Sequence, residues 1–268
     1  MVQQGTRKTR LRTAVPSSTV DTEGHRAGLG RQPHRFALRD LLARKLPNCR
    51  RETIGALATT ARLRTVHPGE SVYRQGEPPP LTVILDGFGT FRRTTVNGVY
   101  VASGIGRAGD LFGFSSMASV ASSVELVALT ECQVAQWPGS EIRALAGEDP
   151  GLAVDAVDSM AVALHAMIER VDGFLHQDAR VRVIRILARH RDLFFGDPAI
   201  LTRAHLPSLV GTSREMTGRV LRQLEREGTI ERVGRTGLRL LRPDHLTASA
   251  GQRRARRGRA VATAQHAQ

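Results

Sequence analysis

The sequence predicts an α+β fold in three parts: an N-terminal antiparallel β-barrel, one long helix, and a C-terminal winged helix-turn-helix. Three observations lead to it. Short β-rich runs separated by turn residues occupy residues 66–137, at the spacing typical of a barrel or sandwich. An apolar stripe with alternating spacings of four and three follows over residues 157–175. Two helical segments joined at a glycine, and then a basic hairpin, occupy residues 202–241.

The composition indicates an ordinary globular protein and excludes several classes. Of the 268 residues, 41% are hydrophobic, which is enough for a core. No apolar run approaches the roughly 18–20 residues of a membrane span, and the N-terminus lacks the apolar segment of a signal peptide. Two cysteines, Cys49 and Cys132, are too few for a disulfide framework, a four-ligand zinc site or a thiolate cluster. We expect a cytoplasmic protein with reduced thiols and no membrane partner.

The net charge of +14 is unevenly distributed along the chain. Residues 1–35 and 249–268 each carry +5, residues 36–177 carry −2, and residues 178–248 carry +6. The basic excess outside the tails therefore lies in the C-terminal part. This pattern suits a neutral domain joined to a nucleic-acid-binding one, although solubility alone would explain the Arg-rich tails equally well.

The first half of the chain is predicted to pass from a tail through helices to strands. Residues 1–35 form a basic tail without periodicity, predicted to be disordered, as is the Arg-rich tail of residues 247–268. From Phe36 to about Leu63, apolar spacing fits short helices interrupted at Pro47. In the strand region that follows, "TVNGVYV" indicates a hairpin with an Asn-Gly turn. A closed barrel of this size either holds one small ligand or fills with side chains.

A long helix is expected to begin near Asp149, after a shorter helix that follows Pro138. Its stripe covers nearly three heptads and is typical of a seam with a partner helix, the alternative being packing on its own barrel. The stripe consists of Val157, Ala161, Leu164, Ile168, Val171 and Leu175. Asp178 is then expected to cap an amphipathic helix. The inward residues of that helix are Val181, Ile184, Leu187 and Ala188.

Residues 202–228 carry the most specific pattern in the chain. Thr202 is expected to cap a short first helix, and Gly211 to supply the positive φ of a tight turn. Thr212 or Ser213 then caps the second helix, because Thr212-x-x-Glu215 has capping-box spacing. At about 100° per residue, the second helix has two sides. One side gathers Thr217, Val220, Leu221 and Leu224, and the other gathers Arg214, Glu215, Gly218, Arg219 and Arg222.

The outer side of this helix is chemically fit to read the major groove of DNA. Arginine holds guanine through two hydrogen bonds, and glutamate accepts one from cytosine. The exposed Gly218 costs up to about 1 kcal/mol relative to alanine, which suggests a close approach to the backbone. The alternative is a solvated face with ion pairs such as Glu215–Arg219. A hairpin with a Gly-rich turn follows and favours DNA binding. Its arginines are Arg232, Arg235 and Arg239.

Over about residues 40–246 the chain resembles the Crp/Fnr superfamily of bacterial transcription regulators. The motif of this family, Thr-Arg followed by Gly-x-Ser-Arg-Glu-x-x-x-Arg, occurs here as Thr202, Arg203, Gly211, Ser213, Arg214, Glu215 and Arg219. The resemblance implies that Arg214, Glu215 and Arg219 read base edges. It also implies that Thr202, Arg203 and Ser213 position the phosphate backbone, to which we add Arg222 and Arg235. Pro207 departs from the pattern and should kink or shorten the first helix.

The N-terminal part also resembles this family, through "HPGESVYRQGE", "VILDGFGTF" and "GDLFG". The resemblance implies a jelly-roll domain of the cyclic-nucleotide-binding type. Its phosphate cassette departs from the family pattern at several positions. Phe114 follows Gly113 where the family's binders have Glu, and Ser122 precedes Ser123 where they have Arg.

The positions that contact adenine in the family are also changed, to Met167 and Ile168. Without a cation, a buried cyclic phosphate loses a charge-assisted bond. We therefore predict that the barrel does not bind cyclic AMP in the usual way. It is either filled by side chains or takes an apolar or unrelated ligand. Arg92, Arg93 and Arg107 are candidate replacement cations.

We predict no cofactor, no metal and no catalytic residue, and the effector stays open. An Fnr-type cluster needs four cysteines, and His67, His165 and His176 qualify as haem ligands by residue type alone. No nucleophile–base pair or metal-ligand spacing occurs, so an enzyme is not indicated.

The sequence thus predicts a β-barrel domain (36–148), a dimerisation helix (149–177) and a winged helix-turn-helix (178–246). We expect a homodimer that binds a pseudo-palindromic operator in double-stranded DNA, with RNA polymerase as a further partner, in the nucleoid of the cytoplasm. One alternative is a regulator that responds to a cyclic nucleotide or another small ligand. The other is a ligand-sensing or scaffold protein whose helix-turn-helix mediates protein contacts.

Overall fold

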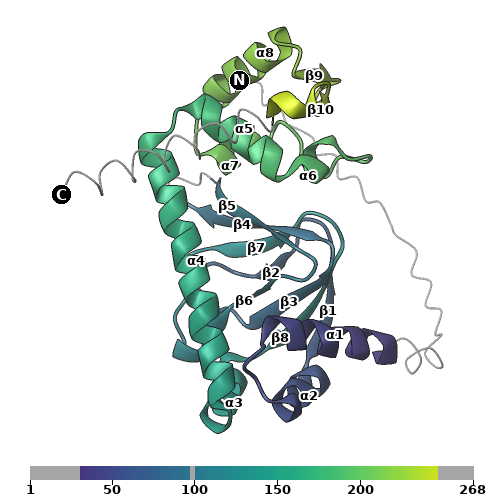
Figure 1. Cartoon of the computed structure of the whole chain (residues 1–268), viewed down its shortest axis with the longest axis vertical. Helices are drawn as coiled ribbons and strands as arrows, with labels where there is room; N and C mark the ends of the chain where they lie inside the picture. Colours follow the sequence, from purple (N-terminus) through teal and green to yellow (C-terminus); the bar gives the residue numbers. More distant parts are fainter. Residues whose placement is uncertain (1–30, 97–99, 247–268) are drawn as a thin grey trace, which may run out of the picture.

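The structure, a computed structural model, describes residues 31–96 and 100–246. Two β-sheets lie beside the long helix α4 (Pro150–His176), and helices α5 to α8 lie over one end of the sheets (Figure 1). This arrangement confirms the predicted α+β fold with a long helix between a β-domain and a winged helix-turn-helix.

Within the described residues the β-domain consists of two four-stranded antiparallel sheets, in the orders β1-β8-β3-β6 and β2-β7-β4-β5. The strands are β1 (Arg62–Val66), β2 (Ser71–Tyr73), β3 (Leu81–Asp86), β4 (Phe88–Thr94), β5 (Tyr100–Arg107), β6 (Leu111–Phe112), β7 (Glu125–Ala128) and β8 (Cys132–Trp137). The predicted closed barrel is therefore wrong in detail, since no ladder joins the two sheets in this part of the chain. Closure is not needed, because apolar side chains of both sheets already fill the space between them.

Three helices cover the other end of the sheets: α1 (Arg31–Lys45), α2 (Arg51–Thr60) and α3 (Gly139–Glu148). The start of α1 corrects the predicted tail, which extended to residue 35. Pro33 in the first turn does not oppose the helix, since the backbone N–H groups there have no helical partner. Leu63 lies in β1, paired with Ala135, and not in a helix as predicted. The rest of the two predicted tails, residues 1–30 and 247–268, lies outside the described residues.

The predicted hairpin is present as the pairing of β4 with β5, which ends at Thr94 opposite Tyr100. Its Asn97-Gly98 turn lies outside the described residues.

Two buried carboxylates fix the start of α4 to the turn between α1 and α2. The Asp149 side chain accepts hydrogen bonds from the backbone N–H of Arg50 at 2.8 Å and of Gly151 at 3.0 Å, and so caps α4. Asp155, six residues further along the chain, accepts from the Asn48 side chain at 2.8 Å. Burial raises the pKa of Asp149, but these donors, together with Thr53 and Cys49, outweigh it and lower the pKa to about 2.

The C-terminal domain contains α5 (Ala179–Arg189), α6 (Arg191–Phe195), α7 (Leu206–Val210), α8 (Arg214–Arg226) and the hairpin β9 (Ile230–Val233) and β10 (Gly237–Leu240). As predicted, Asp178 caps α5, accepting from Val181 N–H at 2.8 Å. Ile184 and Leu187 are buried in the domain core as predicted, and Val181 and Ala188 are half-buried.

This domain packs directly on the β-domain. Ala102 and Ile105 of β5 lie against its core. Arg107, at the end of β5, donates to Asp192 at 3.4 Å and lies 3.3 Å from His190 Nδ1. Burial, together with nearby arginines, lowers the pKa of His190 to about 4, so its ring is neutral at pH 7. The position of α8 is thus tied to the β-domain through α5 and α7.

Candidate nucleic-acid interface

Helix α8 begins at a tight turn that only glycine fits. Gly211 has φ of +65°, and a Cβ there would lie 2.6 Å from the Phe174 ring. Ser213 then caps the helix, its Oγ accepting from Met216 N–H at 3.1 Å. Of the two predicted caps, Ser213 is therefore the one used, and Thr212 is not. The Ser213 hydroxyl is consequently engaged in holding the helix start.

The two sides of α8 differ as the spacing predicts. Thr217, Val220 and Leu224 are buried, together with Leu221, whereas Arg214, Glu215, Arg219 and Arg222 are exposed. The Glu215 and Arg219 side chains form an ion pair at 3.1 Å, with exposed fractions of 80% and 64%. An exposed pair of this kind contributes only about 0.3–0.5 kcal/mol, so bases could displace it at little cost.

The surface around Gly218 is open. A Cβ at this position would meet only an Arg222 nitrogen at 3.6 Å among the described residues, an ordinary van der Waals distance. The fold therefore does not require glycine here.

The first helix of the pair, α7, is short and starts late. It covers Leu206–Val210, with Pro207 in its first turn, and so confirms that this proline shortens the helix. The predicted cap at Thr202 is wrong, because the Thr202 N–H and hydroxyl both lie close to His205 Nδ1, at 3.0 and 3.1 Å. A helix extended back to Thr202 would place the proline ring in its interior, where it clashes with the preceding turn.

Arg203 holds the turn of the β9–β10 hairpin, the wing, through hydrogen bonds. Its guanidinium donates to the carbonyls of Gly234, at 3.1 Å, and of Arg235, and its backbone N–H donates to Thr236 at 3.0 Å. Arg203, predicted to bind phosphate, is thus occupied in supporting the wing. The wing arginines Arg232 and Arg239 pair with Glu225 and Glu231 at 2.7 and 2.8 Å. Arg235, at the turn, is exposed, and its side chain forms no ion pair with the described residues.

The four described residues at the predicted phosphate cassette, Gly113, Phe114, Ser122 and Ser123, carry no positive charge of their own. Gly113 has φ of +101°, and a Cβ there would lie 2.4 Å from the Pro80 carbonyl oxygen. Phe114 is 3% exposed and packs in the core near Trp137. The Ser122 hydroxyl donates to the Val124 carbonyl at 2.7 Å, while Ser123 is exposed.

The three candidate replacement cations do not line the cavity that lies between β5, α4 and α5. Arg92 pairs with Glu125 at 2.7 Å and stacks on Tyr100, Arg107 reaches the C-terminal domain, and Arg93 is exposed on β4. The candidate haem ligands His67, His165 and His176 are exposed.

A cavity of about 870 Å³ instead lies between β5, α4 and α5, with Ser123 and Met167 on its wall. Its arginines come from α4 and α5, which the sequence reasoning did not consider. They are Arg170, Arg182, Arg185 and Arg189. Arg170 could have been predicted from the sequence, because it follows Met167 by three residues and therefore lies on the same side of α4.

The predicted seam of α4 is a continuous exposed apolar surface. Five of its large residues are exposed, namely Val157, Leu164, Ile168, Val171 and Leu175, and Ala161 between them is exposed as well. The alternative, packing on the β-domain, is therefore wrong for this stripe. The helix is also long and apolar enough, by length and composition, to cross a membrane, which corrects the prediction that no apolar run approaches that length.

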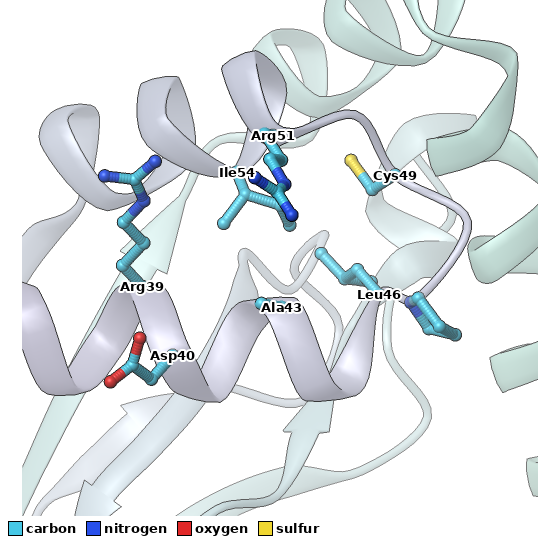
Figure 2. A pocket seen from close by; sticks show the side chains of 8 residues that line it. Arg39, Asp40, Ala43, Leu46, Cys49, Arg51 and Ile54 are labelled. Carbon is cyan, nitrogen blue, oxygen red and sulfur yellow. The ribbon is translucent and has the colours of Figure 1, made fainter.

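A smaller hollow between α1 and α2, of about 360 Å³, carries no reactive group (Figure 2). Cys49 on its wall donates its thiol to Asp149 at 3.3 Å. Burial, the hydrogen bond to Asp149 and the charges of Asp149 and Asp155 raise the pKa of Cys49 to about 12. The thiol is therefore protonated at neutral pH and unsuited to nucleophilic attack.

Comparison with known families finds two matches that follow the two domains. Residues 63–149 match the cyclic nucleotide-binding domain, and residues 181–249 match the Crp-like helix-turn-helix domain. The chain is also 31% identical over 118 residues to the cAMP-activated global transcriptional regulator Vfr of Pseudomonas aeruginosa. That alignment covers 41% of this chain and 54% of Vfr, about half of its length.

Solved structures share the fold over most of their length. The c-di-GMP responsive global regulator CLP of Xanthomonas campestris is 22% identical with a TM-score of 0.59, covering 70% of this chain and 98% of CLP. FixK2 of Bradyrhizobium japonicum is 20% identical with a TM-score of 0.60, covering 70% of this chain and 96% of FixK2.

Proposed function

The chain belongs to the Crp/Fnr superfamily of bacterial transcription regulators, and on this premise we propose that it is a homodimeric, sequence-specific DNA-binding regulator. The observation that carries the proposal is the outer side of α8. Arg214, Glu215 and Arg219 are exposed around the open surface at Gly218, while four residues on the opposite side anchor the helix. In this proposal these three side chains read base edges in the major groove.

Phosphate contacts come, in this proposal, from the exposed Arg222 on α8 and the exposed Arg235 in the turn between β9 and β10. Ser213, Thr202 and Arg203 act through the scaffold, since their side chains hold the helix start, the turn before α7 and the wing. Backbone N–H groups at the start of α8 remain available to a phosphate.

The exposed stripe on α4 supports a dimer, and a bilayer is the less suitable partner for it. The start of the same helix is buried against the β-domain through Leu152 and Ala156, and Asp155 is held by Asn48. In a dimer, two α8 helices related by a two-fold axis read half-sites about one DNA turn apart. We propose domain limits of 36–148, 149–177 and 178–246, a location in the cytoplasmic nucleoid, and RNA polymerase as a further partner on the family relation alone.

A gel-shift experiment with genomic fragments of the source bacterium tests this function against the rival scaffold role. A regulator retards a small subset of fragments at moderate salt, because base contacts add to the sequence-independent phosphate contacts. A protein that uses its helix-turn-helix only for protein contacts retards none, even at low salt.

The Arg214→Ala variant is expected to bind its operator about 10- to 100-fold more weakly and to lose preference at one base pair of each half-site. The reason is that a guanidinium fork on a base is worth about 1–3 kcal/mol of discrimination. Dissociation constants on the operator and on random DNA measure this effect. An equal loss on both DNAs would show that Arg214 contacts phosphate, not a base.

Calorimetry with cyclic AMP and cyclic GMP is expected to detect no binding at micromolar concentration. The cassette presents Ser122 with its hydroxyl bound to Val124 and presents buried Phe114, so neither the phosphate nor the ribose meets its usual partner. A micromolar dissociation constant for either nucleotide would refute the assignment of a degenerate cassette. The Arg170→Gln variant serves as the control in that case, since a loss of binding would locate the nucleotide in the adjoining cavity.

A further inference from the structure

The cavity between β5, α4 and α5, here called the hinge cavity, joins the three parts of the molecule. Its walls come from the β-domain, the second half of α4 and the C-terminal domain. Apolar side chains make up much of the surface, among them Phe91, Ile105, Met167, Phe174 and Ile186. A volume of about 870 Å³ falls within the range of small-molecule sites in proteins.

The charge of the hinge cavity is strongly positive. Four arginines line it, and Glu169 is the acidic residue among its described lining residues. Within the described part of the chain, no ion pair joins Glu169 to any of the four. Two of the arginines have structural partners. Arg182 donates to the carbonyls of Gln177 and Val210, at 2.6 and 3.1 Å, and Arg185 donates to the Gln177 side chain at 2.8 Å.

The side chains of the other two, Arg170 and Arg189, make neither a hydrogen bond nor an ion pair with the described residues. Arg170 is half-buried, and its guanidinium reaches β5 near Gly104. Burial, followed by the like charge of Arg189, lowers the pKa of Arg170. Two cations that face the same apolar space with no ion pair to Glu169 destabilise the empty site, and an anion between them removes that repulsion.

We propose that the hinge cavity binds an amphipathic organic anion, with its acid group between Arg170 and Arg189 and its apolar body against Phe91, Ile105 and Met167. The arginines supply charge-assisted hydrogen bonds, and the apolar walls supply burial. A carboxylate and a phosphate monoester share the required chemistry. The site differs from the degenerate cassette in its cations, which come from α4 and α5 and not from the β-domain.

Because Arg170 precedes the junction at Gln177–Asp178 and Arg189 follows it, a bound anion links α4 to the domain that carries α8. This part of the inference rests on the proposed function, since it makes the anion the effector of a DNA-binding regulator. The anion binds one orientation of α5 relative to α4 more tightly than others, and therefore shifts the population toward that orientation.

Isothermal titration calorimetry of the full chain with decanoate, decyl phosphate, 1-decanol and acetate tests the site. Decanoate or decyl phosphate, or both, should bind, and which of them binds more tightly identifies the acid group. Decanol, which lacks the charge, and acetate, which lacks the apolar body, should bind at least about tenfold more weakly, the loss expected for one charge-assisted bond. Arg170→Gln and Arg189→Gln should each weaken decanoate or decyl phosphate by a similar factor. Arg62→Gln, on exposed β1, is the matched control and should bind like the wild type.

The inference is overturned if neither decanoate nor decyl phosphate binds at about 1 mM. It is also overturned if both the Arg170→Gln and the Arg189→Gln variants bind these acids as tightly as the wild type. Arg189 is exposed, so its variant remains informative even where Arg170→Gln does not fold. Operator binding is measured separately by gel shift. If the protein binds the anion but retards no DNA fragment, the proposed function is refuted and the anion site is supported. If it binds DNA but not the anion, the anion site is refuted and the proposed function is supported.

Discussion

Replacing Leu164 by Glu should make the protein monomeric and weaken its operator binding by about 100-fold or more. Leu164 lies in the middle of the exposed stripe on α4 and is 62% exposed in the single chain. In a symmetric dimer the new carboxylate would be buried in an apolar seam beside its own copy, and burial of like charges is strongly unfavourable. A monomer then reads one half-site and loses the effective concentration gained by linking two reading heads, typically a factor of 100 to 10,000.

Analytical ultracentrifugation measures the oligomeric state, and titration of a labelled operator measures the affinity. Val162→Glu is the matched control, because Val162 is an exposed valine of the same helix that lies outside the stripe. That variant should remain dimeric and bind normally. A dimeric Leu164→Glu protein with unchanged operator affinity would contradict the assignment of the seam.

Replacing Asp149 by Ala should lower the free energy of unfolding by about 3 kcal/mol. Asp149 is 2% exposed, caps α4 and binds the Arg50 N–H. Loss of a cap costs about 0.5–2 kcal/mol, and each buried donor left without a partner costs about 1–3 kcal/mol more. Urea denaturation followed by circular dichroism measures the change. Asp158→Ala, at an exposed position about two turns beyond the start of the same helix, should change stability by less than about 0.5 kcal/mol.

The Asp149 carboxylate also makes the folding stability of the protein depend on pH in the acid range. Its pKa is about 2 in the folded chain, against an ordinary value of 3.8, so the unfolded chain binds more protons in between. Its stabilising effect is therefore fully present above about pH 4 and is lost as the pH falls toward 2. An Asp149→Ala variant that unfolds at the same urea concentration as the wild type at pH 7 would show that this network does not hold α4.

The parts of the fold that follow from local patterns could be predicted well. The spacing of Thr217, Val220 and Leu224 alone determines which side of α8 is buried, and Asp178 caps α5 as its position implies. The closed barrel could not be settled in this way, because closure depends on hydrogen bonds between strands far apart in the chain. The predicted helix cap at Thr202 was wrong for a related reason. Threonine is a suitable capping residue, but Pro207 lies in the first turn of α7, so the helix starts after Thr202.

The candidate site could be predicted only in part. The base-reading residues follow one another on one helix, so sequence spacing brings them together. The cations of the hinge cavity, by contrast, come from α4 and α5, and only the docking of the C-terminal domain on β5 places Arg189 near Arg170. Arg203 shows the same limit, since its wing partners lie about thirty residues further along the chain.

The most direct test of the DNA-binding account is selection of bound sequences from a pool of random double-stranded DNA, with no cyclic nucleotide present. We expect enrichment of a pseudo-palindrome whose half-sites are centred about 10–11 base pairs apart, and a changed base preference within each half-site for Arg214→Ala. Recovery of no enriched sequence by the wild-type protein, or of the same sequence by both proteins, would contradict it.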